Sequence, residues 1–127
     1  MRIIFVASFL LFVASVAMAQ QVYNVCQYGA VGNGKADDAT AIQKAIDLCS
    51  AEGGGQVVLP ANHTFLAGPI QLRSNVNLHI EANATLLANP DESIYHLSAF
   101  GANEGEGMMW LYANDAENIS ITGAEPY

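Results

Sequence analysis

Residues 28 to 60, YGAVGNGKADDATAIQKAIDLCSAEGGGQVVLP, constrain the fold more than any other part of the chain. A glycine-rich stretch, a helix-forming stretch and a β-forming stretch follow one another here without a linker. Gly29, Gly32 and Gly34 predict a flexible turn in the first of these. In the middle stretch, apolar side chains recur at i, i+3, i+4 and i+7, which predicts an amphipathic helix with one apolar face. These side chains are Ile42, Ala45, Ile46 and Cys49. The glycines at 53–55 end the helix, because successive glycines do not hold a helical turn.

Two acidic residues, Asp37 and Asp38, stand immediately before this helix. We expect their carboxylates to cap it, by accepting the free N–H groups of its first turn and offsetting the positive end of the helix dipole. A catalytic pair is disfavoured, because adjacent side chains diverge and a glycosidase needs two carboxyl groups facing each other across a sugar. A phosphate loop over residues 29–34 is also disfavoured, since the two acids would repel a phosphate.

Short β-forming stretches fill the rest of the chain, with polar or proline-containing corners between them. The predicted strands are Gln21–Cys26, Val57–Leu59, Thr64–Ala67, Ile70–Leu72, Val76–Ile80, Thr85–Leu87, Met109–Tyr112 and Asn118–Thr122. Single polar corners suit the coils of a parallel β-helix better than hairpins, which need two-residue turns such as Asn-Gly. No fixed sequence repeat is evident, so the pattern alone predicts a short-stranded all-β protein with one helix.

The first 19 residues have the pattern of a signal peptide. A basic start at Met1-Arg2 precedes an apolar run over 3–16, and Ala17-Met18-Ala19 is a small-x-small cleavage pattern. The run is too short for a transmembrane helix, which needs about 20 apolar residues. We therefore expect cleavage before Gln20, secretion to the extracellular or periplasmic space, no membrane attachment afterwards, and an incomplete, N-terminal part of one domain over residues 20–127.

The chain is acidic, with a formal net charge of −8, and loss of the leader would remove Arg2 and leave the rest more acidic still. Such a charge excludes nucleic acid as a natural partner and repels other polyanions. His63, His79 and His96 show no metal-ligand spacing, and we expect no cofactor and no metal. Glu104 and Glu106 lie in a glycine-rich stretch that we interpret as an exposed loop, with calcium binding as the alternative.

Two cysteines, Cys26 and Cys49, would remain after cleavage of the leader. One interpretation is a disulfide formed in an oxidising compartment, which would contribute roughly 3 kcal/mol in the chain-entropy model. The other is two separate thiols, since Cys49 lies on the apolar face of the predicted helix. The sequence leaves both open.

Aromatic residues near the C-terminal end are candidates for sugar contacts. Tyr95, Trp110 and Tyr112 have the ring surface to stack on a sugar, although aromatic residues at strand spacing are also typical of a core. Tyr95 and His96, which follow the corner Pro90-Asp91, are the predicted substrate-binding residues. Three Asn-x-Ser/Thr sequons, at positions 62, 83 and 118, are either glycan acceptors or chance matches.

The order and spacing of four stretches resemble the N-terminal part of family 28 glycoside hydrolases, the polygalacturonases, and more widely the right-handed parallel β-helix proteins that act on pectin. The stretches are YGAVGNGKADDATAIQKAID, GGGQVVLP, GPIQLRSNVNLHIEANATLLANPD and ENISITG, and together they cover residues 22–123. The resemblance implies an all-β right-handed parallel β-helix, of which this chain holds the N-terminal coils. The predicted helix would then cap the first coil and cover its apolar end.

The resemblance also bears on activity. Family members carry their catalytic aspartates and their His and Arg-Lys substrate motifs on later coils, so we expect no catalytic residue in this chain and no activity from it alone. The complete enzyme would be a monomer that hydrolyses α-1,4-galacturonosyl bonds in pectin or polygalacturonate with inversion. The alternatives are a polysaccharide lyase or rhamnogalacturonan-cleaving enzyme on the same fold, and a non-catalytic carbohydrate-binding or surface module. An isolated chain with an open last coil should be marginally stable.

Overall fold

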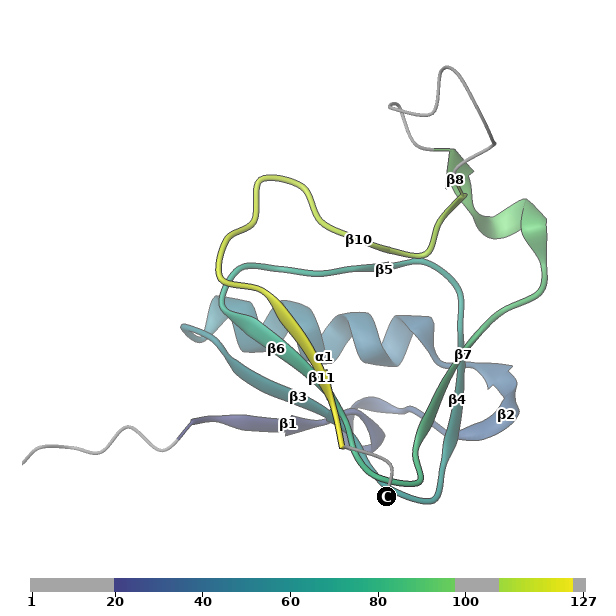
Figure 1. Cartoon of the computed structure of the whole chain (residues 1–127), viewed down its shortest axis with the longest axis horizontal. Helices are drawn as coiled ribbons and strands as arrows, with labels where there is room; N and C mark the ends of the chain where they lie inside the picture. The colour runs from purple at the N-terminus through teal and green to yellow at the C-terminus, as the bar shows by residue number, and fades with distance from the viewer. Residues whose placement is uncertain (1–19, 98–107, 125–127) are drawn as a thin grey trace, which may run out of the picture.

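The computed structural model describes residues 20–97 and 108–124 (Figure 1), so the predicted signal peptide lies outside the described residues. The strands are β1 (Val22–Asn24), β2 (Asn33–Asp37), β3 (Gly55–Leu59), β4 (Thr64–Ala67), β5 (Ile70–Gln71), β6 (Val76–Ile80), β7 (Thr85–Ala88), β8 (His96–Leu97), β9 (Met108–Met109), β10 (Leu111–Tyr112) and β11 (Ser120–Gly123). The helices are α1 (Ala39–Ala51) and two short 3-10 helices, η1 (Val25–Tyr28) and η2 (Glu92–Ile94). No helix in the described part of the chain has the length and apolarity to cross a membrane.

The strands stack into three parallel sheets, each of which forms one side of a three-sided coil (Figure 1). The strand orders are β1-β3-β6-β11, β2-β4-β7 and β10-β5, and every pair within them is parallel. Strands β8 and β9 form a separate antiparallel pair. This is the right-handed parallel β-helix that the resemblance implied, confirmed in an all-β chain with one α-helix.

The core lies inside the coil, where inward side chains of successive coils stack on each other. Val57 of β3 is paired with Leu78 of β6, and both are fully buried. Phe65 of β4 and Ile70 of β5 close the other two sides and are equally buried. Alternation along β6 buries Val76 and Leu78 and leaves Asn77 and His79 partly exposed, so a short strand is enough to contribute to a continuous core.

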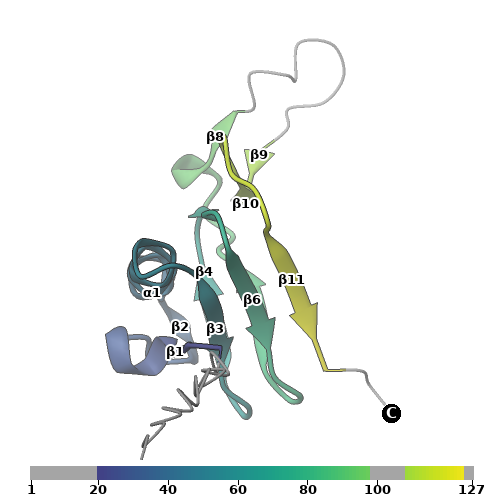
Figure 2. The same cartoon turned by 90° about the vertical axis from the view of Figure 1, so that its left-hand side faces the viewer.

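Helix α1 has the predicted apolar face: Ile42, Ala45, Ile46 and Cys49 are all fully buried in the core cluster. The helix lies at the end of the stack opposite β11 (Figure 2). It also takes the place of a strand beside β5, because the side-chain amide of Gln43 accepts the N–H of Gln71 at 2.8 Å and donates to its C=O at 2.9 Å. The amide of one side chain thus replaces the peptide group of a neighbouring strand.

Two predicted boundaries in the first coil were wrong. The glycine-rich stretch, predicted as a turn, forms strand β2, which pairs with β4 through Asn33 opposite Thr64 and Asp37 opposite Leu66. The predicted strand over 21–26 ends early, because the Asn24 side chain accepts the N–H of Cys26 at 2.9 Å and starts helix η1. In both places a tertiary or side-chain contact overrides the local pattern.

Asparagines occupy corners of the coil. Asn62, Asn75, Asn83 and Asn118 have φ angles between 57° and 66°, a left-handed conformation that asparagine tolerates better than most residues. Asn118 donates from Nδ2 to Oδ1 of Asn75 in the coil before, at 3.1 Å. All three sequon asparagines stand at such corners, so these residues have a conformational role whether or not they carry glycans.

Candidate functional site

Asp38 fastens the glycine-rich loop to the start of α1. Its side chain is 3% exposed and accepts the N–H groups of Val31 and Gly32, both at 2.9 Å. Its carboxylate makes no hydrogen bond to the helix, so the prediction of a side-chain cap was wrong for Asp38. The N–H groups of the loop converge on the carboxylate and draw it away from the first turn.

Asp37 joins three coils at one corner. One carboxylate oxygen accepts the N–H of Ala39, the first residue of α1, at 2.8 Å, which is the contact expected of a cap. The other accepts the N–H of Gly68 at 3.0 Å and the side-chain Nδ2 of Asn89 at 2.7 Å. With both oxygens engaged by N–H donors, Asp37 acts as a structural acceptor, and it shares no site with Asp38.

A pocket of about 420 Å³ opens where β7 ends and the chain later returns to β10. Its walls are partly aromatic and partly polar. They are formed by Ala88, Asn89, Pro90, Glu92, Tyr95, Met108 and Trp110. We refer to these seven residues as the aromatic pocket.

The two rings of the aromatic pocket are held by their polar atoms. The Tyr95 hydroxyl donates to the backbone C=O of Asn89 at 2.6 Å, and the Trp110 indole N–H donates to the C=O of Ala67 at 3.0 Å. The Trp110 C=O accepts the N–H of Ile70 at 2.8 Å. The rings therefore offer the pocket mainly apolar surface, in orientations fixed by the coil.

Glu92 lines this pocket, Asp91 precedes Glu92 in the chain, and Asp37 accepts a hydrogen bond from the wall residue Asn89. Hydrogen bonds from the Ser93 side chain and backbone lower the pKa of Asp91, which keeps it ionised near neutral pH. Burial raises the pKa of Tyr95, and the charges of Asp37 and Asp91 raise it further. Tyr95 is therefore a neutral phenol at neutral pH.

The structure thus places one of the two predicted substrate-binding residues, Tyr95, in a pocket. His96 lies in β8 opposite Met109 of β9. Sequence reasoning missed Asn89 and Glu92 as wall residues; the corner Asn89-Pro90 was the available signal. Glu104 and Glu106, considered as calcium ligands, lie outside the described residues. The described part of the chain contains no group of three acidic, His or Cys side chains that could hold a metal.

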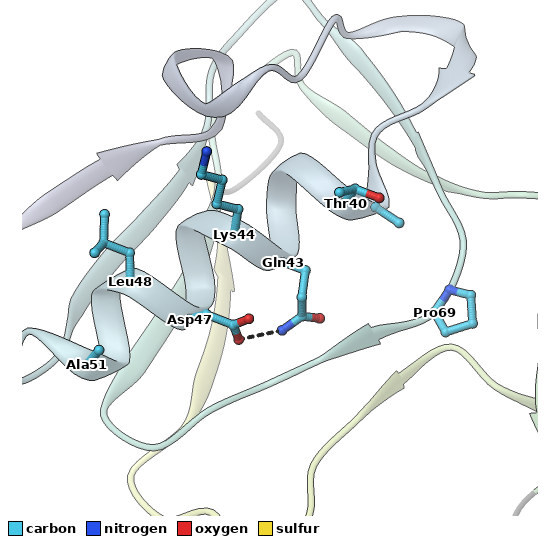
Figure 3. Close-up of a pocket in the computed structure, with 8 residues that line it drawn as sticks. Thr40, Gln43, Lys44, Asp47, Leu48, Ala51 and Pro69 are labelled. Atoms are coloured by element: carbon cyan, nitrogen blue, oxygen red, sulfur yellow. Dashed lines mark hydrogen bonds between the residues drawn. The ribbon is translucent and has the colours of Figure 1, made fainter.

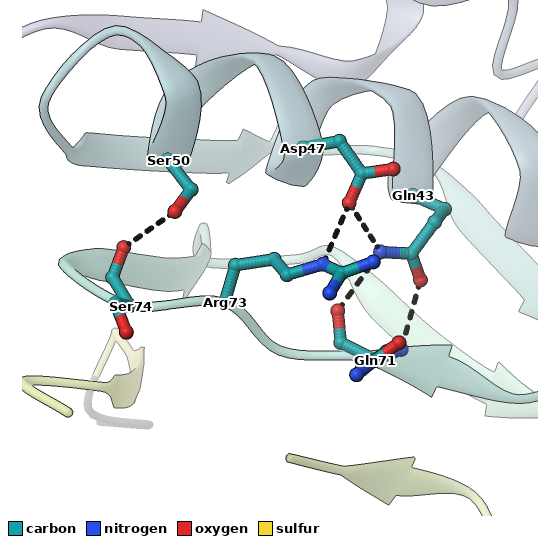
Figure 4. Close-up of polar contacts among 6 residues, drawn as sticks. All are labelled: Gln43, Asp47, Ser50, Gln71, Arg73 and Ser74. Carbon is teal, nitrogen blue, oxygen red and sulfur yellow. Dashed lines mark hydrogen bonds and ion pairs between the residues drawn. The ribbon is translucent and has the colours of Figure 1, made fainter. Parts of the chain in front are cut away.

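A second hollow, of about 750 Å³, lies along the outer face of α1 and reaches Pro69 (Figure 3). Polar side chains of α1 in and beside this hollow join the helix to residues 71–74 (Figure 4). Asp47 accepts from Gln43 at 2.9 Å and from Arg73 at 3.1 Å, and Ser50 donates to the C=O of Ser74 at 2.8 Å. This surface attaches the helix to the coil, and we do not take it as the functional site.

Both cysteines are free thiols: Cys26 is half-buried in η1, and Cys49 is buried in α1. Of the two alternatives, the structure contains the separate thiols and not the disulfide. Burial raises the pKa of both groups, and nearby acidic side chains add to it. Because the thiolate is the nucleophilic form, neither cysteine is primed for catalysis.

Comparison with known proteins places this geometry in a family. A plant relative from Arabidopsis thaliana, named "Probable polygalacturonase At3g15720", is 30% identical over 120 residues, or 91% of this chain and 24% of that protein. The mannuronan C5-epimerase AlgE3 of Azotobacter vinelandii is 50% identical over 98 residues, 77% of this chain and 5% of the epimerase. The solved exopolygalacturonase of Thermotoga maritima matches with a TM-score of 0.71 and 35% identity, covering 83% of this chain and 24% of that one.

This chain spans about a quarter of the length of the Arabidopsis relative and of the Thermotoga exopolygalacturonase. The family model for rhamnogalacturonase A/epimerase, pectate lyase-like proteins matches residues 22–120, which run from β1 to the first residue of β11. The chain therefore belongs to the rhamnogalacturonase A/epimerase, pectate lyase-like family, with polygalacturonases among its relatives.

Proposed function

We propose that this chain is the N-terminal part of a secreted glycoside hydrolase that cleaves α-1,4-galacturonosyl bonds in pectin. The observation that carries the proposal is the match in fold and sequence to an exopolygalacturonase over most of the chain. The structure of this chain supports a structural and binding role for these residues, because they start the β-helix and form the aromatic pocket beside it.

The hydrolytic groups belong, in this proposal, to coils beyond the present chain. Hydrolysis with inversion needs one carboxylic acid to protonate the leaving oxygen and one carboxylate to activate water, roughly 6.5–9.5 Å apart. Asp37 and Asp38, the adjacent acids at the start of α1, are occupied by backbone and side-chain N–H donors. We therefore expect this segment to be inactive alone and to contribute binding surface.

Epimerase or lyase chemistry is the second candidate, and the similarity to a mannuronan C5-epimerase favours it. Both of these reactions begin by removing the C5 proton of a uronate, whereas hydrolysis leaves that proton in place. An epimerase would exchange the C5 proton with solvent without cutting the chain. A lyase would cut the chain and leave an unsaturated sugar.

One experiment separates these reactions. The reading frame continuing beyond Tyr127 is expressed and incubated in D₂O with polygalacturonate, rhamnogalacturonan or mannuronan. We expect new reducing ends from polygalacturonate, no ultraviolet-absorbing unsaturated product and no deuterium at C5. Deuterium at C5 without cleavage would establish the epimerase, and an unsaturated product would establish the lyase. The 127-residue chain is the matched control and should release no reducing ends.

Secretion is tested separately. We expect the exported protein to begin at Gln20, after removal of the leader at 1–19. N-terminal sequencing of the protein from the medium or the periplasm checks this, and a cell-retained product that still begins at Met1 would contradict it.

A further inference from the structure

We propose that the aromatic pocket between Tyr95 and Trp110 binds an uncharged pyranose ring and disfavours a free uronate. In pectin such a ring is a methyl-esterified galacturonate or a neutral sugar. The inference deepens the proposed function, on which its choice of pectic ligands rests, and it assigns the pocket a preference opposite to that of a site for polygalacturonate.

The shape of the pocket suits a sugar ring. A pyranose presents C–H groups on its faces and hydroxyls around its rim, and the C–H face packs well against an aromatic ring. Tyr95 and Trp110 are oriented by their hydrogen bonds to Asn89 and Ala67, so they provide ring surface that is already in place before binding. Ordering a ligand against fixed rings costs less than ordering the rings as well.

The polar wall supplies an acceptor for the rim of the sugar. Glu92 lines the pocket, and an ionised carboxylate accepts hydrogen bonds from hydroxyl groups. Asn89, the other polar wall residue, has its Nδ2 engaged by Asp37 and therefore holds the wall in place. A wall that accepts hydrogen bonds but offers no cation suits hydroxyl groups and does not suit a carboxylate.

The charges around the pocket select against a uronate. Glu92 lines it, Asp91 precedes Glu92 in the chain, and Asp37 binds the wall residue Asn89 at 2.7 Å. The negative charges of Asp37 and Asp91 already oppose ionisation of Tyr95. A uronate carboxylate placed against this wall would meet the same repulsion.

No cation among the described side chains, which do not include that of His96, offsets these acids at the pocket. Its lining contains no Lys, Arg or His among the residues that the structure describes. Arg73 pairs with Asp47 of α1 at 3.1 Å, on the outer side of the helix. Lys44 lies beside the hollow on α1, and Lys35 is an exposed residue of β2. Methyl esterification removes the uronate charge and leaves the ring shape unchanged, so the ester is the form that fits.

Trp110 makes the proposal measurable, because it is the only tryptophan of the chain. The full chain is titrated with three trisaccharides while tryptophan emission is recorded, and calorimetry measures binding independently. The probes are fully methyl-esterified trigalacturonate, unesterified trigalacturonate and β-1,4-galactotriose. At low salt we expect at least one neutral probe to bind roughly tenfold tighter than the unesterified acid. This difference in affinity should become smaller in 0.5 M salt, where the Debye length is only a few ångströms.

Variants separate ring stacking from charge. Tyr95→Ala should abolish binding of the neutral probe, while Tyr95→Phe, which keeps the ring, should bind it within about threefold of the parent. Glu92→Gln should reduce the ratio of the affinities for neutral and acidic probes severalfold. Glu117→Gln is the matched control: it changes the net charge equally but sits at the corner where the Glu117 C=O accepts the N–H of Asn75. Glu117→Gln should leave the ratio of the two affinities unchanged. Circular dichroism checks that each variant is folded.

Two outcomes would overturn the proposal: unesterified trigalacturonate binding as tightly as the neutral probes, or no binding of either neutral probe by fluorescence and calorimetry. The neutral probes also distinguish the source of the ring, since binding of galactotriose alone identifies a neutral sugar rather than an ester. The same experiments distinguish failure of this inference from failure of the proposed function. If the longer protein cleaves polygalacturonate while the pocket shows no preference, only this inference is lost; if galactotriose binds and no pectic substrate is cleaved, only the hydrolase proposal is lost.

Discussion

The two ends of the β-helical stack are finished in different ways (Figure 2). At the first coil, α1 buries four apolar side chains in the core, and its Gln43 amide pairs with the backbone of Gln71 in β5. At the other end, β7, β10 and β11 are the outermost strands of their sheets in the described part of the chain. Exposed apolar side chains occur at both ends: Val22 of β1 is 62% exposed and Ile121 of β11 is 48% exposed.

The difference shows what a helix can do for a parallel coil. A strand edge exposes N–H and C=O groups that pair readily with another strand, so a stack needs a terminal element that does not itself offer an edge. Helix α1 provides an apolar face for the core and one amide for β5, while β1 and β2 are the outermost strands of the other two sheets at this end. In the described part of the chain, no strand or helix follows β7, β10 or β11 in the stack, so these edges can accept a further coil or another molecule. Ala88 of β7 also lines the aromatic pocket.

The largest effect on stability should come from placing a charge on the buried face of α1. Ile46→Asp places an unpaired carboxylate where the parent side chain is fully buried, at a cost of at least about 4 kcal/mol. That is a large fraction of the roughly 5–15 kcal/mol by which a typical domain is stable, so the variant should aggregate. Soluble yield and circular dichroism measure this. Leu48→Asp, on the exposed face of the same helix, is the control, and a soluble, unchanged Ile46→Asp protein would refute the capping role of α1.

A smaller loss should follow removal of the buried carboxylate that holds the loop. Asp38→Ala leaves the N–H groups of Val31 and Gly32 without their acceptor, which should cost about 2–3 kcal/mol. Urea unfolding gives the free energy of unfolding directly. Asp47→Ala removes an exposed carboxylate from α1 and should cost under about 1 kcal/mol. Equal losses in the two variants would mean that Asp38 is not a structural anchor.

Breaking the strand-like contact of the helix should have a more modest effect. Gln43→Ala removes both hydrogen bonds to Gln71 and should lower the free energy of unfolding by roughly 1–2 kcal/mol. The neighbouring exposed substitution Lys44→Ala should stay within about 0.5 kcal/mol of the parent. If urea unfolding showed no difference between the two, the side-chain amide would not be acting in place of a strand.

A substitution in β11, at the other end of the stack, should have the smallest effect on stability. Ile121→Lys alters a side chain that is 48% exposed on β11, so the free energy of unfolding should move by no more than about 0.5 kcal/mol. A lysine on an edge strand opposes edge-to-edge pairing, and self-association should fall. Sedimentation at several concentrations measures it. A large loss of stability without any change in association would show that β11 is as well packed as the inner strands.

Sequence reasoning succeeded where the pattern is local. The apolar stripe of α1 and most strands were predicted from side-chain spacing, and the polar corners between them were located correctly. It failed for β2 and for Asp38, because their partners lie elsewhere in the fold: β2 exists through pairing with β4, and the Asp38 carboxylate turns toward Val31 and Gly32.

The candidate site shows the same limit. Tyr95 could be proposed from its aromatic ring and its place after a corner. The contact between Asp37 and Asn89, which holds the pocket wall, could not be predicted. These residues are 52 positions apart in the chain and meet only when the coils stack. Trp110 was left between core and site by the sequence, and the pocket lining places it at the site.

Hydrogen exchange on the full chain tests the contrast between the two ends most directly. Amides in the interior strands β3 and β6 should exchange only through global unfolding, whereas those of β7 and β11 should open locally and exchange orders of magnitude faster. Mass spectrometry of peptides covering Gly55–Leu59 and Ser120–Gly123 compares the two regions. Slow exchange at β3 with fast exchange at β11 is the predicted result. Equal protection of the two strands would contradict an open end and the account built on it.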